Sequence, residues 1–141
     1  MPRKKEAGRL AGSDNLTLAA DVGGPEDGPT VVLLHGGGQT RHSWAGTWQV
    51  LVDAGWRAYS VDLRGHGDSD WSPDGDYSPE PFGRDAYAIA TAMSTPPILV
   101  GASLGGIASM MAIGEADDQA KVARGLVLVD VANRIEVQGR D

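Results

Sequence analysis

The sequence contains no cysteine, and that absence excludes several kinds of site. A disulfide framework, a cysteine zinc site, an iron–sulfur cluster and a thiol nucleophile all require this residue. A chain of 141 residues can bury roughly two thirds of its unfolded surface, so it can build a core without such cross-links. We therefore expect one soluble domain that is held together by its apolar core.

Basic residues and long apolar runs are also scarce. The chain has 12 Lys and Arg against 19 Asp and Glu, a net charge of -7, which argues against a nucleic-acid surface. No window approaches about 18 uninterrupted apolar residues, so no membrane segment is expected. The basic start, Arg3–Lys5, lacks the apolar stretch of a signal peptide. We expect a disordered arm over residues 1–14, a folded part over 15–141 and a cytoplasmic location.

Short apolar runs alternate with helical periodicity along the rest of the chain. The runs predict strands at 31–34, 58–61, 98–100 and 126–129, with a further strand at 16–19. Between them, apolar stripes predict helix faces that belong to the core: Trp44, Trp48, Leu51 and Val52; Phe82, Ala86, Ile89 and Met93; Leu104, Ile107, Ala108 and Met111. This order predicts an α/β fold, a doubly wound and mostly parallel sheet whose ligands bind at the carboxyl ends of the strands.

One strand end carries the pattern G-x-S-x-G, over Gly101–Gly105. It lies between a predicted strand that ends at Val100 and a predicted helix that starts at Leu104, the setting of a nucleophile elbow. Such a turn holds its serine, here Ser103, in a strained backbone conformation, and the flanking Gly101 and Gly105 allow close approach of backbone. The alternative is a serine that only caps the helix.

A run of three glycines, Gly36–Gly38, follows the first parallel strand directly. Its N–H groups could stabilise an oxyanion, with Gly37 and Leu104 as the donors and Gly36 and Gly38 in support. A phosphate loop is disfavoured because its lysine is missing, and a flexible glycine turn stays open as an alternative. For His35, at the strand end, we favour holding the loop by hydrogen bonds over acting as a general base.

The loop Asp62–Ser69 offers carboxylates, a guanidinium and an imidazole. Metal binding by Asp62, His66 and Asp68 matches no known ligand spacing. An internally hydrogen-bonded loop, in which Arg64 pairs with a nearby aspartate, is the preferred interpretation, so no metal is predicted. Residues 68–81 are expected to form a surface loop.

Three aromatic residues could line an approach to the site: Trp44, Trp71 and Tyr77. For each of them, however, exposure in a loop or packing in the core is favoured.

Three motifs in this order resemble those of the α/β-hydrolase-fold superfamily: HGGGQ at 35–39, DLRGHGDSD at 62–70 and GASLGG at 101–106. The chain is similar to the amino-terminal half of such a domain, truncated after about the sixth strand. Its motif wording resembles the group of bacterial esterases, epoxide-hydrolase-like enzymes, lactonases and cofactor-free haloperoxidases. A serine at the nucleophile position implies an ester, thioester, lactone or similar small acyl substrate, and no cofactor.

The same resemblance implies a catalytic histidine near the carboxyl end of the domain, after the acid that orients it. This chain has only His35, His42 and His66, and all of them precede Ser103. The resemblance therefore implies that the base, the lid and the carboxyl-terminal part are absent. Some members supply the acid from the position of Asp130, but a structural or pocket-lining aspartate is favoured there because the more usual acid position is missing.

Three hypotheses follow. The chain is the amino-terminal half of a serine hydrolase, a catalytically dead remnant or ligand-binding module, or a structural module whose sheet edge beside 126–129 pairs with another chain. Because half a sheet leaves apolar faces unburied, self-association through an uncovered apolar surface is also expected.

Overall fold

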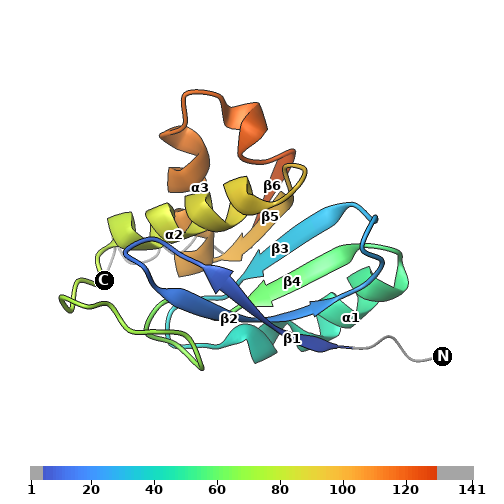
Figure 1. Ribbon diagram of the computed structural model, residues 1–141, viewed down its shortest axis with the longest axis horizontal. Helices are drawn as coiled ribbons and strands as arrows, with labels where there is room; N and C mark the ends of the chain where they lie inside the picture. The colour runs from blue at the N-terminus through green and yellow to red at the C-terminus, as the bar shows by residue number, and fades with distance from the viewer. Residues whose placement is uncertain (1–4, 130–141) are drawn as a thin grey trace, which may run out of the picture.

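A computed structural model describes residues 5–129, which form one sheet with helices on both faces (Figure 1). The six strands are β1 (Glu6–Ala11), β2 (Thr17–Gly23), β3 (Thr30–Leu34), β4 (Arg57–Val61), β5 (Ile98–Ala102) and β6 (Gly125–Val129). They lie in the order β1-β2-β4-β3-β5-β6, with β1 and β2 antiparallel and the other four strands parallel. The predicted α/β fold with a mostly parallel sheet is confirmed.

The helices divide between the two faces of the sheet (Figure 1). They are α1 (Ala45–Asp53), α2 (Pro79–Ala92) and α3 (Leu104–Gly114), with short 3-10 turns η1 (Arg41–Trp44) and η2 (Gln119–Lys121). Because side chains alternate along a strand, Val31 and Leu33 of β3 face α1, whereas Val32 and Leu34 face α2 and α3. Within residues 5–129, the helices are too short or too polar to cross a membrane.

The arm predicted over residues 1–14 is wrong where it overlaps β1. Residues 6–11 pair antiparallel with β2, from Glu6 opposite Val22 to Ala11 opposite Thr17. In this strand only Leu10 packs against the core, so the sequence lacks the apolar alternation that reveals a strand. β1 therefore forms through backbone pairing with β2 and not through burial of an apolar face.

The predicted apolar stripes hold for α1 and α2 and only partly for α3. Trp48 and Val52 are buried on α1, as are Phe82, Ala86 and Ile89 on α2. The buried residues of α3 are small: Gly105, Gly106, Ala108, Ser109 and Ala112. Small side chains let α3 approach the sheet and α2 closely, which leaves the larger residues of the predicted stripe half-buried.

Strand β6 forms one edge of the sheet and, among the described residues, pairs with β5 alone. Its last three side chains are 49%, 42% and 38% exposed at Val127, Leu128 and Val129. These residues define the β6 edge, an apolar surface at the opposite side of the sheet from β1.

Candidate active site

Ser103 occupies a sharp turn between β5 and α3. Its backbone has φ 51° and ψ -113°, a region that residues with a Cβ rarely adopt. Although Ser103 stands at the N-cap of α3, its side chain makes no capping hydrogen bond, so the helix-cap alternative lacks its defining contact. The turn is fixed by the Ser103 N–H, which donates to the carbonyl of Val129 at 3.2 Å.

Two glycines allow this turn to pack against the end of β3. A Cβ at Gly101 would collide with the backbone of Gly105, and a Cβ at Gly105 would collide with the carbonyl of Leu34. The Gly105 N–H donates to the His35 carbonyl at 3.1 Å. The turn therefore lies directly beside the loop that follows β3.

The glycine loop and the serine turn are in contact. A Cβ built on Gly36 would lie 3.5 Å from Cβ of Ser103, and one built on Gly37 would lie 3.6 Å from Cδ2 of Leu104. The two motifs, more than sixty residues apart in the sequence, thus meet at the carboxyl ends of β3 and β5. This is the edge at which ligands bind in parallel α/β sheets.

The hydrogen bonds of the glycine loop distinguish its three N–H groups. The Gly36 N–H donates to Oε1 of Gln39 at 3.1 Å, and the Gly38 N–H donates to Nε2 of His66 at 3.0 Å. Within residues 5–129 the Gly37 N–H has no acceptor, and neither has the first N–H of α3. The two N–H groups that remain available are the pair that the sequence suggested as oxyanion donors.

His35 is fully buried, and backbone groups occupy both nitrogens of its ring. Nδ1 lies 2.7 Å from the Gly36 carbonyl, and the Leu63 N–H donates to Nε2 at 3.0 Å. Burial lowers the pKa of His35, and the neighbouring His66 lowers it further, against the opposing effects of Gly36 and Asp62. A neutral ring with both nitrogens engaged holds the loop and is not free to take a proton from a serine.

Arg64 and Asp85 form a buried ion pair that anchors the loop after β4. Arg64 Nε and Nη2 donate to the two carboxylate oxygens of Asp85 at 2.7 and 2.8 Å, and both side chains are 1% exposed. Nη2 also donates to Oγ of Ser13 at 2.9 Å and lies 3.1 Å from Asp14. The predicted pairing of Arg64 with an aspartate is confirmed, and the partner comes from α2.

Asp62, suggested above as one of three metal ligands, is instead paired with Arg41. The Arg41 guanidinium contacts Asp62 directly and lies 3.1 Å from both Asp21 and Asp68. The Arg41 N–H also donates to Asp62, at 2.6 Å. Residues 5–129 contain no group of three potential ligands that could hold a metal ion.

A pocket of about 360 Å³ opens beside the first residue of α3. Its lining residues are Gly65, His66, Trp71, Tyr77, Phe82 and Leu104. Trp71 and Tyr77 therefore line an approach to the serine turn, the interpretation that the sequence had disfavoured, while Trp44 packs with the α1 face of the core. The pocket was hard to foresee because Trp71 and Tyr77 lie in a loop without a periodic pattern, while Phe82 belongs to the apolar stripe of α2.

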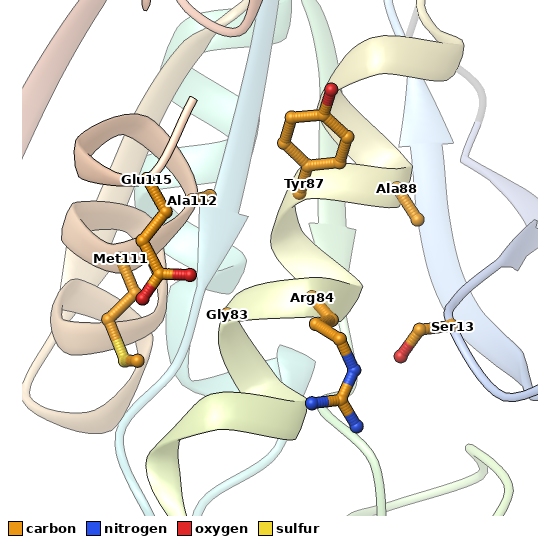
Figure 2. Close-up of a pocket in the computed structure, with 8 residues that line it drawn as sticks. All are labelled: Ser13, Gly83, Arg84, Tyr87, Ala88, Met111, Ala112 and Glu115. Carbon is orange, nitrogen blue, oxygen red and sulfur yellow. The ribbon is translucent and has the colours of Figure 1, made fainter. Parts of the chain in front are cut away.

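A second pocket, of about 380 Å³, lies between α2 and α3 (Figure 2). Arg84 and Tyr87 of α2 and Met111 and Glu115 of α3 project toward it. Ser13, at its rim, donates its hydroxyl hydrogen to Asp85 at 2.7 Å, and none of the predicted site residues lines this pocket. It offers no activated nucleophile, so we place the candidate site at Ser103.

Two parts of the predicted machinery are not found around Ser103. Asp130 lies outside the described residues. Within residues 5–129 no histidine hydrogen-bonds to the Ser103 side chain. His66 acts on the glycine loop instead, a role that sequence reasoning missed because nothing in the spacing links position 66 to position 38.

Comparison with known proteins identifies the family of this chain. The model of the family described as "Alpha/beta hydrolase family" matches residues 31–140. The chain belongs to this family. It is 41% identical over 105 residues to the esterase Rv0045c of Mycobacterium tuberculosis, an alignment that covers 73% of this chain and 33% of that protein.

Solved structures show the same relationship. The esterase RhEst1 from Rhodococcus sp. ECU1013 superposes with a TM-score of 0.70 at 30% identity, over 92% of this chain and 46% of that one. The epoxide hydrolase VrEH1 from Vigna radiata shares the fold, with a TM-score of 0.78 at 22% identity, over 90% of this chain and 40% of that one. The chain thus spans less than half the length of each of these three proteins.

Proposed function

We propose that this chain carries the nucleophile and the oxyanion hole of a serine hydrolase that acts on an ester, thioester, lactone or similar acyl substrate. The observation that carries the proposal is the strained Ser103 beside the N–H groups of Gly37 and Leu104, which have no acceptor within residues 5–129. The esterase Rv0045c and the esterase RhEst1 support an ester substrate, whereas VrEH1 supports only the fold.

The proposed chemistry is acyl transfer through a covalent intermediate. The Ser103 oxygen attacks the carbonyl carbon as its proton passes to a base, and the carbonyl electrons move onto an oxyanion that accepts hydrogen bonds from Gly37 and Leu104. Collapse of this intermediate expels the alcohol or thiol, which accepts the proton from the base. Water then cleaves the acyl-serine by the same two steps and releases the acid.

The aromatic pocket favours the binding of an apolar acyl or alcohol group of the substrate. Trp71, Tyr77 and Phe82 line it, and Leu104 joins it to the proposed oxyanion hole. Ring faces provide apolar contact area at a low cost in side-chain entropy, and the hydroxyl of Tyr77 is occupied because it accepts the Ser72 N–H at 2.9 Å. We therefore expect uncharged substrates with a compact apolar group to be preferred over charged ones.

The proposal requires a base that the described residues do not supply. His35 has both nitrogens occupied, and His42 and His66 make no hydrogen bond to Ser103. We place the base in a part of the domain that the longer relatives possess and this chain does not span. Asp130 remains the proposed acid, outside the described residues.

Labelling by a fluorophosphonate tests the nucleophile. Applied to a longer hydrolase domain that contains this chain and supplies the base, the probe is expected to attach to Ser103, as located by mass spectrometry of the peptide. In the longer domain, Ser103→Ala should lower turnover of a p-nitrophenyl ester by about 10⁴-fold or more, whereas Ser43→Ala, on exposed η1, should not. Turnover that persists in Ser103→Ala, or labelling at another serine, would contradict the proposal.

The pocket beside Leu104 also supports a second candidate function, a ligand-binding module without turnover. This alternative predicts that the chain binds a small aromatic ester in the pocket beside Leu104 and releases it unchanged. Product formation that depends on Ser103 would exclude it.

A further inference from the structure

Two histidines, one in the glycine loop and one in the loop after β4, connect these loops by reciprocal hydrogen bonds. Each ring accepts a backbone N–H from the loop of the other. His35 begins the glycine loop and accepts the Leu63 N–H from the loop after β4, at 3.0 Å. His66 belongs to the loop after β4 and accepts the Gly38 N–H from the glycine loop, also at 3.0 Å. Their ring centroids are 4.9 Å apart. Together these contacts, called here the histidine clasp, join the two loops at both ends.

The hydrogen bonds fix the protonation state of both rings. A backbone N–H can only donate, so Nε2 of each ring must carry a lone pair. Nδ1 of His35 lies 2.7 Å from the Gly36 carbonyl, and Nδ1 of His66 lies 2.9 Å from the Arg64 carbonyl. A carbonyl can only accept, so each Nδ1 carries the hydrogen. Both imidazoles are therefore neutral Nδ1–H tautomers, a state in which neither repels the other.

His66 is itself held by rigid parts of the fold. Its Nδ1 anchor, the Arg64 carbonyl, belongs to the residue whose side chain is buried against Asp85 of α2. Its ring lies at 70° to that of Phe82, with centroids 6.4 Å apart. The acceptor for Gly38 is thus fixed to the α2 side of the sheet. The position of the glycine loop depends on it, because Gly38 has φ +81° and faces open space, where an added Cβ would meet no atom within 4 Å.

We propose that His66 is a positioning residue, whose Nε2 holds Gly38 so that the preceding N–H, that of Gly37, points toward Ser103. The N–H groups of Gly36 and Gly38 are already hydrogen-bonded, so within residues 5–129 Gly37 has the one glycine-loop N–H that is available to donate. This inference rests on the proposed function for its catalytic meaning. Its structural content, the hydrogen bond and the orientation it imposes, can be measured without any turnover.

Two substitutions at His66 distinguish the contribution of its hydrogen-bond acceptor from the contribution of its aromatic ring. His66→Phe keeps an aromatic ring against Phe82 and removes the acceptor, whereas His66→Gln supplies a carbonyl oxygen that can accept the Gly38 N–H. His42→Gln, on exposed η1, serves as the control. Nitrogen NMR of the intact chain should show a bare Nε2 on His66. Hydrogen exchange at Gly38 should accelerate at least about tenfold in His66→Phe, with a shifted Gly37 amide, and return toward the wild-type rate in His66→Gln.

Activity provides the second readout. In the longer domain, His66→Phe should lower kcat for an ester by about 10- to 100-fold with little change in KM, since an oxyanion donor acts in the transition state. Unchanged Gly37 and Gly38 amides in folded His66→Phe, or a protonated Nε2 in the wild type, would overturn the inference. Loss of the Gly38 protection with full activity would overturn the positioning role. Failure of Ser103 labelling with an intact clasp would instead contradict the proposed function alone.

Discussion

A buried imidazole makes the stability of a protein depend on pH, and His35 is the residue where this effect is expected. Its side chain is fully buried, and burial lowers its pKa from the ordinary value of 6.5. The unfolded chain therefore binds a proton at position 35 more readily than the folded chain does. Above about pH 6.5 both states are neutral there and the residue contributes no pH dependence.

We expect the free energy of unfolding to decrease as the pH falls below about 6.5, because the unfolded state then gains protons first. One such group contributes a slope of at most about 1.4 kcal/mol per pH unit. His35→Gln should remove this part of the slope, although the variant is less stable throughout. Urea denaturation at intervals between about pH 5 and 7.5 measures both proteins. Parallel pH profiles for the two would contradict the prediction.

Single residues also show how far the sequence could predict the site. Ser103 was predictable because an elbow is a local structure, made by five consecutive residues. His66 was not, because its acceptor role depends on the position of Gly38, which lies in another loop. The partner of Arg64 could not be chosen among the chain's many acidic residues until α2 placed Asp85 beside it.

Among elements, the Arg64–Asp85 pair links three segments that are distant in the sequence. It joins the loop after β4 to α2, and through Ser13 it joins both to the turn between β1 and β2. Both partners are 1% exposed, so removing the Asp85 charge leaves the buried Arg64 guanidinium with Asp14, which is 39% exposed, as its remaining counter-ion.

Asp85→Asn should therefore lower the free energy of unfolding by about 3 kcal/mol or more. Asp53→Asn is the matched control: Asp53 is exposed at the end of α1 and accepts a single hydrogen bond from Gln49, so its loss should cost under about 0.5 kcal/mol. Equilibrium denaturation with urea measures both variants. Equal effects of the two substitutions would contradict a structural role for the pair.

The succession of strands and helices was predictable because it, too, depends on local sequence patterns. Strands covered on both faces, such as β3, are continuously apolar, and their pattern differs clearly from the periodicity of α1 and α2. β1 was not predictable, because its stability comes from backbone pairing with β2 and only Leu10 reaches the core. The buried face of α3 was misread because its small residues carry a weak apolar signal.

At the scale of the whole molecule, the two edges of the sheet differ. β1 carries Glu6 and Arg9, charges that discourage pairing with another sheet, whereas the β6 edge is apolar. We propose that a second copy of this chain binds at the β6 edge at high concentration.

The apparent mass of the chain in analytical ultracentrifugation should therefore rise with concentration. Leu128→Lys should suppress the rise by placing a charge on the β6 edge. Val50→Lys should not, because Val50 is also apolar and 68% exposed but lies on α1, away from that edge. A mass that stays constant with concentration in the wild type, or equal suppression by both variants, would contradict this proposal.

The backbone of Ser103 also has a consequence for how such a chain can evolve. Glycine would adopt φ 51° with far less strain than serine, so the side chain at this position costs stability, about 1 to 3 kcal/mol for a conformation of this kind. A lineage in which the chain had only to fold would gain from glycine at position 103. Under the proposed function, descendants that no longer hydrolyse a substrate should therefore lose this serine early, while keeping the glycines on either side of it.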